Sequence, residues 1–371
     1  MAGYIGIGGK ASRLKGIYWG VSNKARKIKK GYIGVNGVAR QFYSSGISKA
    51  TYVGRLADLD KSWYDLKAAP VGEDYLLFAG GTIGDDITAN AIAYDEEFVR
   101  QNIQGLSGST RYHGAASVEG YALFACGQGS ASNFRGYTNA YDAALVRTIP
   151  TSLTNAGERH NLCGCSVDNG SLSHCLFAGG STESSSSSDV VDGYDANLVK
   201  VKAANLTTTT YDLGSAVVGQ YIIFAMGDSG NYAQIYDGNT LEKNETSINI
   251  PYERSRRTGI SFGKYAMFTN SLREVYTIDE NLVRNQIDVS GGQSGGVVYG
   301  GVGHPDGYAL FAGSKGSAYG LNQDLVIERF TIESDKDNVA VGRVGNIVIL
   351  AGGNSSGSAT ASKRVNGFKL S

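Results

Sequence analysis

The feature that most constrains this chain is a short apolar segment that recurs seven times along it. The first copy is Tyr75-Leu76-Leu77-Phe78-Ala79-Gly80-Gly81, and the later copies are centred on Phe124, Phe177, Phe224, Phe268, Phe311 and Leu350. Successive copies are separated by 46, 53, 47, 44, 43 and 39 residues. Self-similarity at a nearly fixed period of this length is typical of repeat architectures. We therefore expect an array of seven similar units.

Each unit contains two further recurring pieces. A Tyr-Asp-x-x-Leu-Val pattern follows the apolar segment, as in 141–146 and 194–199, and a small-residue segment such as 114–118 precedes it. The apolar segment suits a buried strand. We name the expected strands a (small residues), b (the apolar segment), c (ending at Tyr-Asp) and d (after it). Four strands in each repeat of 40–50 residues predict a β-propeller, and seven repeats predict seven blades.

The two ends of the repeat array are predicted to join. Residues 364–370 have the pattern of a strand c, and no strand d follows them. Residues 51–56 form a possible strand that precedes the first strand a and belongs to no unit. We expect residues near 50–57 to supply the missing outer strand of the last blade. Such closure removes the exposed sheet edges that promote aggregation.

Charge divides the chain into two parts. Residues 1–45 contain nine Lys or Arg and no acidic residue, whereas the remainder holds 25 basic and 34 acidic side chains. No apolar run approaches the roughly 20 residues of a membrane span, and the first residues show no signal-peptide pattern. We therefore expect two domains, 1–45 and 46–371, synthesised in a cytoplasm without a signal peptide.

Residues 4–43 repeat with a period of 14, which places Tyr4, Tyr18 and Tyr32 in register. Gly8-Gly9, Ser22-Asn23 and Asn36-Gly37 fall where two-residue hairpin turns would lie. The segment is therefore predicted to form three β-hairpins. Hairpins this small bury too little surface to be stable alone, so they should dock on a partner, most simply an acidic one. Nucleic acid is the less favoured alternative, because the lysines belong to no known nucleic-acid-binding module.

The glycine-ended strand b and the later aromatic residue resemble the kelch repeat, although the Trp usual in kelch repeats is missing. This resemblance implies an all-β fold: a seven-bladed, kelch-like β-propeller with four-stranded blades, closed by an N-terminal strand and preceded by the hairpin segment.

The sequence of residues 31–43, following the basic residues 24–30, resembles tandem hairpin segments in tail and baseplate proteins of phages and prophages of Gram-positive bacteria. The resemblance implies a virion protein, present in several copies, that attaches to tail or baseplate proteins through its hairpins. The attachment residues would be Tyr4, Tyr18, Trp19, Lys27, Lys29, Lys30 and Tyr32. The propeller would then be a receptor-binding head for a host cell-surface glycan, without enzymatic activity.

Propeller geometry places the long b–c and d–a loops on one face, where function commonly resides. Aromatic rings beside hydrogen-bonding groups suit sugars, which offer an apolar face and polar edges. The candidate ligand-binding residues are Arg111, Tyr112, Phe134, Arg135, Tyr137, Tyr211, Tyr232, Tyr252, Arg254 and Tyr319. For any one of them, an ordinary solvated loop residue is the simpler interpretation.

Catalysis, metal and cofactors are not predicted. The four histidines do not recur at matching positions, and sialidase sequence boxes are absent. A mutarotase-like enzyme is the main catalytic alternative, with Glu158, Arg159 and His160 as its charged cluster; a structural tail component is another. Zinc at His160, Cys163, Cys165, His174 and Cys175 is disfavoured because these residues occupy strand positions and form no Cys-x-x-Cys pair.

Overall fold

The computed structural model describes most of the chain. Outside the described residues lie 1–3, 8–9, 14–16, 22–23, 29, 36–37, 45–46, 131–132, 155–158, 169–172, 183–185, 252–257, 270, 272, 290–297, 314–315, 334–338 and 355–360. Of residues 1–46, only the backbone strands are described. The described residues are strands, turns and loops, and none of them forms a helix that could cross a membrane.

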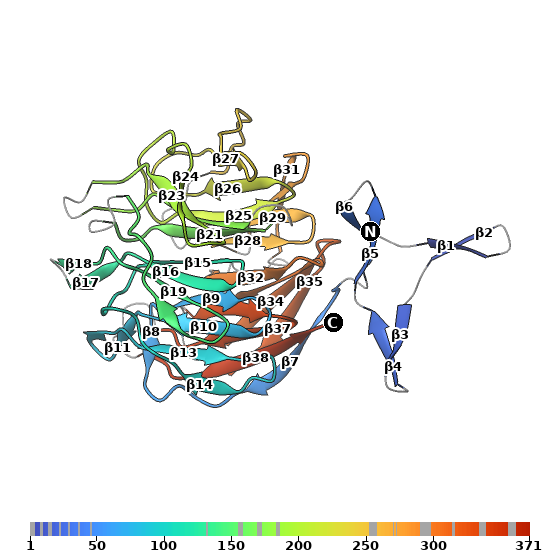
Figure 1. The fold of residues 1–371 in the computed structure, drawn as a ribbon, viewed down its shortest axis with the longest axis horizontal. Helices are drawn as coiled ribbons and strands as arrows, with labels where there is room; N and C mark the ends of the chain where they lie inside the picture. The colour runs from blue at the N-terminus through green and yellow to red at the C-terminus, as the bar shows by residue number, and fades with distance from the viewer. Residues whose placement is uncertain are drawn as a thin grey trace.

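Seven antiparallel sheets follow one another along the described part of the chain (Figure 1). The first sheet consists of β9 (Lys67–Val71), β10 (Tyr75–Ala79), β13 (Ala91–Tyr94) and β14 (Arg100–Asn102), and the second of β15 (Gly114–Val118), β16 (Tyr121–Ala125), β19 (Thr138–Tyr141) and β20 (Arg147–Thr148). The third consists of β21 (Cys163–Asp168), β22 (Ser173–Ala178), β23 (Val191–Asp195) and β24 (Lys200–Lys202). The fourth consists of β25 (Gly214–Val218), β26 (Tyr221–Ala225) and β27 (Gln234–Asp237).

The fifth sheet consists of β28 (Thr258–Phe262), β29 (Tyr265–Thr269), β30 (Val275–Asp279) and β31 (Arg284–Ile287). The sixth consists of β32 (Gly300–His304), β33 (Tyr308–Ala312), β34 (Ser317–Asn322) and β35 (Ile327–Thr331). The seventh consists of β36 (Ala340–Val344), β37 (Ile347–Ala351), β38 (Val365–Leu370) and β7 (Ala50–Arg55). The predicted order of strands a, b, c and d is therefore present, and β7 pairs with β38 as expected. In the fourth sheet only an isolated bridge, Tyr236 to Lys243, stands where strand d was expected.

The sheets are arranged side by side through their a strands. Each a strand contacts the next one in the order β9, β15, β21, β25, β28, β32 and β36, and β36 contacts β9. Glycine permits this close approach, because a Cβ on Gly164 would lie 2.2 Å from the carbonyl oxygen of Ala115. The small-residue composition of strand a thus follows from backbone crowding. An all-β, propeller-like architecture is confirmed.

The core lies between neighbouring sheets. Leu123 and Ala125 of β16 pack with Cys175 and Phe177 of β22 in one buried cluster. In the first, second and fourth sheets, the Phe of strand b and the Tyr of strand c meet edge to face, as Phe124 and Tyr141 do at a centroid separation of 6.2 Å. Burial of such a side chain stabilises the fold by about 1.5–3 kcal/mol. The recurrence of these residues therefore reflects packing.

The Asp of the Tyr-Asp pattern stabilises the turn between strands c and d. In the second sheet, the backbone N–H groups of Ala144 and Val146 both donate to Asp142 Oδ1, at 2.9 Å. The turn places Leu145 at a φ of 61°, a left-handed conformation that is costly for leucine. The corresponding turns at Asp95, Asp195 and Asp279 have the same pair of hydrogen bonds.

Replacing Asp142 with alanine should lower the free energy of unfolding by about 1 kcal/mol, as removal of a helix-capping side chain does. The turn would lose both acceptor contacts while the core remained intact. Urea denaturation would measure the change, with Asp142→Asn as the matched control because it keeps the acceptor oxygen. Equal losses in the two variants would contradict this role.

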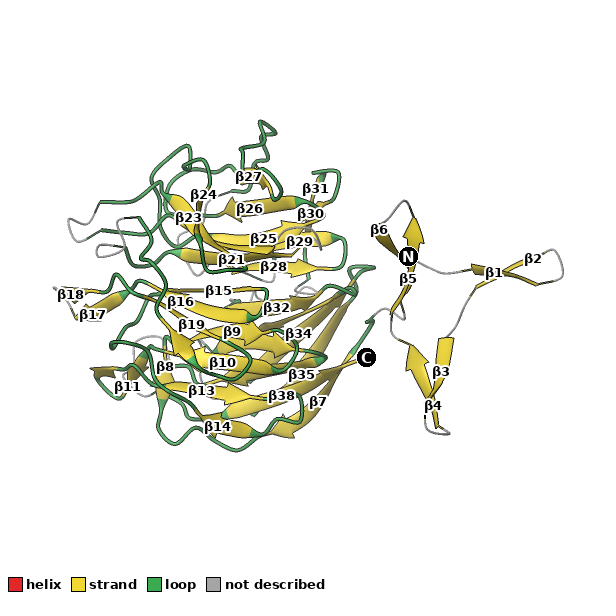
Figure 2. Ribbon diagram, viewed as in Figure 1, coloured by secondary structure: helices red, strands yellow, loops and turns green. Residues whose placement is uncertain are grey.

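Two short sheets include loops after strand b, and the first of them also includes a strand that precedes β9. They are β8 (Trp63–Tyr64) with β11 (Thr82–Ile83) and β12 (Asp86–Ile87), and β17 (Gln128–Ser130) with β18 (Asn133–Phe134). The sequence patterns at 81–90 and 127–139 indicated long loops only. Figure 2 shows these short strands and long loops on one side of the sheets, opposite the short turns.

The basic segment forms the three predicted hairpins. They are β1 (Tyr4–Ile7) with β2 (Lys10–Arg13), β3 (Ile17–Val21) with β4 (Lys24–Ile28), and β5 (Lys30–Val35) with β6 (Val38–Ser44). The predicted turn residues Gly8-Gly9, Ser22-Asn23 and Asn36-Gly37 lie outside the described residues.

Candidate functional site

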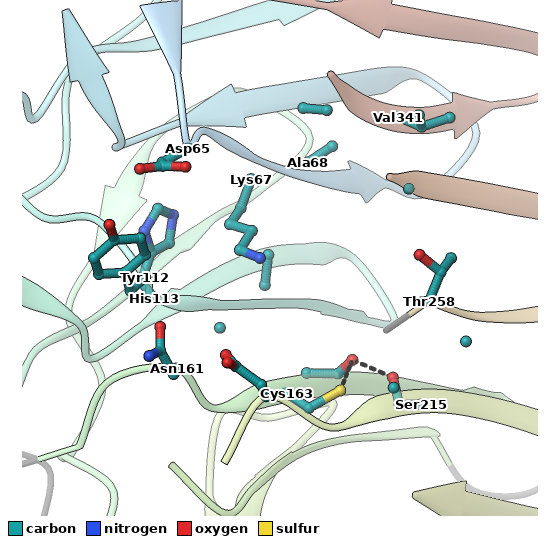
Figure 3. Close-up of a pocket in the computed structure, with 18 of the residues that line it drawn as sticks. Asp65, Lys67, Ala68, Tyr112, His113, Asn161, Cys163, Ser215, Thr258 and Val341 are labelled. Carbon is teal, nitrogen blue, oxygen red and sulfur yellow. Dashed lines mark hydrogen bonds between the residues drawn. The ribbon is translucent and has the colours of Figure 1, made fainter. Parts of the chain in front are cut away.

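A cavity of about 610 Å³ lies where the a strands begin (Figure 3). All seven sheets contribute to its wall. The lining segments are 65–68, 112–115, 161–164, 212–215, 258–259, 299–301 and 339–341. Its size suits a small molecule, since ligand pockets commonly measure 300–1,000 Å³.

Four polar residues at the cavity have the same unusual backbone conformation. Asp65, Tyr112, Asn161 and Asp212 have φ angles of 53–55°, and each stands two residues before a strand a. Asn and Asp tolerate this left-handed region, whereas for tyrosine it is strained. Such residues cluster at functional sites, where the surrounding structure holds them in place. We call these four residues the polar ring.

The polar ring combines two carboxylates, a phenol and an amide, and a cation accompanies them. Among the described lining residues, Lys67 is the only Lys or Arg, and its side chain extends into the cavity (Figure 3). Burial raises the pKa of the Tyr112 hydroxyl, and the nearby Asp65 and Asp212 raise it further while Arg111 lowers it. Tyr112 therefore remains a protonated hydrogen-bond donor at neutral pH.

His113 follows Tyr112 and also lines the cavity, although its side chain is fully buried. Burial is the main cause that lowers the pKa of this imidazole, to about 3. A Cβ atom added to Gly80 would lie only 2.4 Å from His113 Cε1, so the absence of a side chain at Gly80 makes room for the imidazole ring. His113 is thus neutral under most conditions and supports the wall behind Tyr112.

A second group of residues borders the polar ring. The Arg111 guanidinium lies over the Tyr112 ring at 4.8 Å, and its Nε donates to Gln128 Oε1 at 3.3 Å. The His160 and Phe134 rings are in contact, with a centroid separation of 4.9 Å and an interplanar angle of 44°. Desolvation lowers the pKa of His160, while Asp212 raises it. Three predicted ligand residues, Arg111, Tyr112 and Phe134, are therefore grouped near the cavity.

The other predicted ligand residues are dispersed. Arg135 Nε donates to the Ser109 carbonyl, and Tyr319 stacks on Phe311 at 5.7 Å. Tyr137 is 48% exposed and absent from the cavity wall, while Tyr232 lines a separate cavity of about 300 Å³ beside the fourth sheet. Tyr211 directly precedes Asp212, and Tyr252 and Arg254 lie outside the described residues. The side chains of the attachment residues, including Lys27 and Lys30, are likewise not described, and Lys29 lies outside the described residues.

The charged cluster considered for a mutarotase-like enzyme is divided. Arg159 is fully buried, and its Nη2 donates to Asp192 Oδ1 at 2.7 Å. Its Nη1 donates to the Val190 carbonyl at 3.1 Å. Arg159 therefore holds the third sheet to the loop before it, while Glu158 lies outside the described residues.

The four cysteines are free thiols, and burial raises the pKa of each. For Cys163 the pKa is about 11, and for Cys126 and Cys175 it is about 12. Within the described ranges no three His, Cys, Asp or Glu side chains form a metal-binding group. These thiols are packing residues in strands a and b, as their spacing suggested.

Sequence reasoning missed Asp65, Lys67, Asn161 and Asp212. The signal was present in the repeats, since Asp65-Leu66, Asn161-Leu162 and Asp212-Leu213 each precede a strand a at the same offset. Superposing the d–a junctions of the repeats would have revealed a polar residue that recurs there. The predicted ligand residues were instead aromatic and arginine residues of the long loops.

Comparisons with known proteins give structural neighbours only. No family model matches the chain, and no curated protein matches it. A streptogramin B lyase structure aligns with a TM-score of 0.57 and 9% identity, covering 88% of this chain and 98% of that one. Virginiamycin B lyase from Staphylococcus aureus aligns with a TM-score of 0.57 and 11% identity, covering 87% and 99%. At such identities the likeness shows a shared fold.

These neighbours correct the predicted function. The two solved structures named above are lyases, whereas a tail or baseplate protein was expected. The prediction of a non-enzymatic, glycan-binding receptor protein of a phage tail is therefore wrong, and so is its alternative, a structural tail component. The other alternative, a mutarotase-like enzyme, is tested by none of these findings. The predicted partners of residues 1–45, the virion location and the attachment residues are tested by none of these findings and stay predictions.

Proposed function

We propose that this chain is an enzyme that carries out an elimination reaction on a small molecule at the central cavity. The observation that carries the proposal is the polar ring: two carboxylates, a phenol and an amide, all on left-handed backbone, at a cavity of about 610 Å³. The lyase activity named for the two structural neighbours supports the reaction class.

Elimination requires a base that removes a proton from carbon, together with donors that stabilise the developing negative charge and the leaving group. Asp212 is our choice of base, because it lies close enough to both Tyr112 and His160 to affect their pKa values. The Tyr112 hydroxyl and the Lys67 ammonium are the donors. Asn161 and Asp65 would orient the substrate through hydrogen bonds.

Turnover of a streptogramin B antibiotic, followed by liquid chromatography and mass spectrometry, is the first assay. Small molecules that carry a leaving group next to the carbon bearing an acidic C–H bond would complete the panel, because elimination creates a new carbon–carbon double bond that can be detected in any of them. We expect Asp212→Asn and Tyr112→Phe to lower kcat/KM at least about 100-fold. Asp142→Asn, which alters a carboxylate in a distant turn, should leave it unchanged.

Binding measurements separate two ways in which the assay could fail. If the substrate class is wrong, small polar molecules should still bind to the wild type and bind more weakly to Lys67→Met. If no panel member is converted and none binds in a way that depends on Lys67 or Tyr112, the proposed site is wrong.

The blade number, the kelch-like type of the propeller and the domain division are also proposals. We propose that the seven sheets are the blades of a kelch-like propeller and that residues 46–371 form one domain, separate from the hairpin segment 1–45. The succession of contacts between a strands, which returns from β36 to β9, supports seven blades. An experimental structure of the full chain would test both the blade number and the domain division.

A further inference from the structure

The turns opposite the long loops carry a repeated apolar residue. Val99, Val146, Val199, Val283 and Val326 occupy the last position of the Tyr-Asp-x-x-Leu-Val turn, and each is 52–58% exposed. The same position in five sheets thus presents a valine to solvent. A single exposed apolar side chain is ordinary, but here the same position is apolar and exposed in five sheets. We call the a–b and c–d turns together the turn face.

The turn face is strongly acidic. Its c–d turns, at 95–99, 142–146, 195–199, 237–241, 279–283 and 322–326, hold nine Asp or Glu and no Lys or Arg. Its described a–b turns, at 72–74, 119–120, 219–220, 263–264, 305–307 and 345–346, hold four acidic residues and one lysine. Basic residues at the start of strand d have partners elsewhere; Arg100 pairs with Asp60, and Arg284 donates to the Asn249 carbonyl.

The basic segment joins the rest of the chain at this same face. The backbone N–H of Ile47 donates to the carbonyl of Asp306, which lies in an a–b turn, at 3.0 Å. The backbone N–H of Ser48 donates to the carbonyl of Ser371 at 3.1 Å. In Figure 1 the strands of the three hairpins lie on this side and extend beyond the turns. A segment with nine basic residues and no acid therefore emerges beside an acidic surface.

We propose that the hairpin segment of one copy of this chain docks on the turn face of a second copy, and that the exchange is reciprocal. Lysines and arginines of the hairpins would meet the acidic turns, and their apolar residues would cover the valines. A two-fold arrangement satisfies both copies at once, because each supplies one segment and one face. Docking also explains how two-stranded hairpins become stable, which they are not in isolation.

The test uses the full chain and measures its molar mass by light scattering during gel filtration. The wild type should be a dimer at about 50 mM salt, with a Kd at least about tenfold higher at about 500 mM salt, since screening weakens exposed charge pairs. Arg26→Glu with Lys27→Glu, and separately Glu96→Lys with Glu97→Lys, should each raise the Kd at least about tenfold. The matched control, Asp85→Lys with Asp86→Lys, makes the same charge change in a long loop after strand b and should leave the Kd unchanged.

Mixing the two charge-reversed variants decides the arrangement. The acidic hairpins of one variant would meet the basic turns of the other, so a mixed dimer should form with nearly wild-type affinity. A monomeric wild type at low salt, or variants that fail to recover when mixed, would overturn the proposal.

Discussion

Replacing Asp192 with alanine is expected to lower the free energy of unfolding by about 3–5 kcal/mol, because it leaves a buried guanidinium without its counter-ion. Arg159 and Asp192 are both fully buried, and their side chains lie 2.7 Å apart. The other carboxylate oxygen of Asp192 accepts the backbone N–H of Thr154 at 2.6 Å, so the loop before the third sheet would lose a second contact. Urea denaturation at neutral pH would measure the loss.

The matched control is Asp142→Ala, which removes an exposed carboxylate from a turn and should cost about 1 kcal/mol. A double variant, Arg159→Met with Asp192→Leu, should recover much of the lost stability, because apolar groups of similar volume avoid the unpaired charge. A loss below about 1 kcal/mol in Asp192→Ala would contradict a structural role for the pair. It would imply that water reaches Arg159.

His113 should make the folded protein sensitive to acid. Burial lowers the pKa of its imidazole from 6.5 to about 3, so the folded state keeps it neutral while the unfolded state binds a proton. Stability attributable to His113 is therefore complete above pH 6.5 and is lost as the pH falls toward about 3. The slope of this loss is at most about 1.4 kcal/mol per pH unit.

The measurement compares the free energy of unfolding of the wild type and His113→Leu from pH 7 to pH 4. All other titrating groups are common to both proteins, so the difference between the two curves isolates His113. Wild type should lose about 3 kcal/mol more than the variant over this range. Parallel curves would show that His113 is protonated as easily in the folded state as in the unfolded chain.

The repeated framework could be predicted from the sequence because packing imposes it on every unit. Phe124 must meet Tyr141, and Asp142 must accept two backbone N–H groups, so the same or similar residue types return in most of the sheets. The hairpin register and the pairing of β7 with β38 were predicted on the same basis. The missing fourth strand after β27 was not predicted, because the Tyr236-Asp237 turn resembles those that precede a full strand d.

The site was harder to predict because it depends on where the units meet. Asp65 and Asp212 are far apart in the chain, and only the arrangement of a strands brings both to one cavity. Arg159 resembled an exposed loop residue, since its partner Asp192 belongs to a different part of the pattern. The expected phage function relied on residues 31–43, a segment that says nothing about the cavity.

The pairing of β7 with β38 also means that the seventh sheet can be completed only late in translation. Arg55 precedes Val365 by 310 residues, so β7 leaves the ribosome long before its partner exists. Until Val365–Leu370 are made, β7 and the outer edge of β37 each retain unpaired backbone groups that could bind another nascent chain. A premature stop near residue 364 would therefore leave both strands unpaired and produce a chain prone to aggregate.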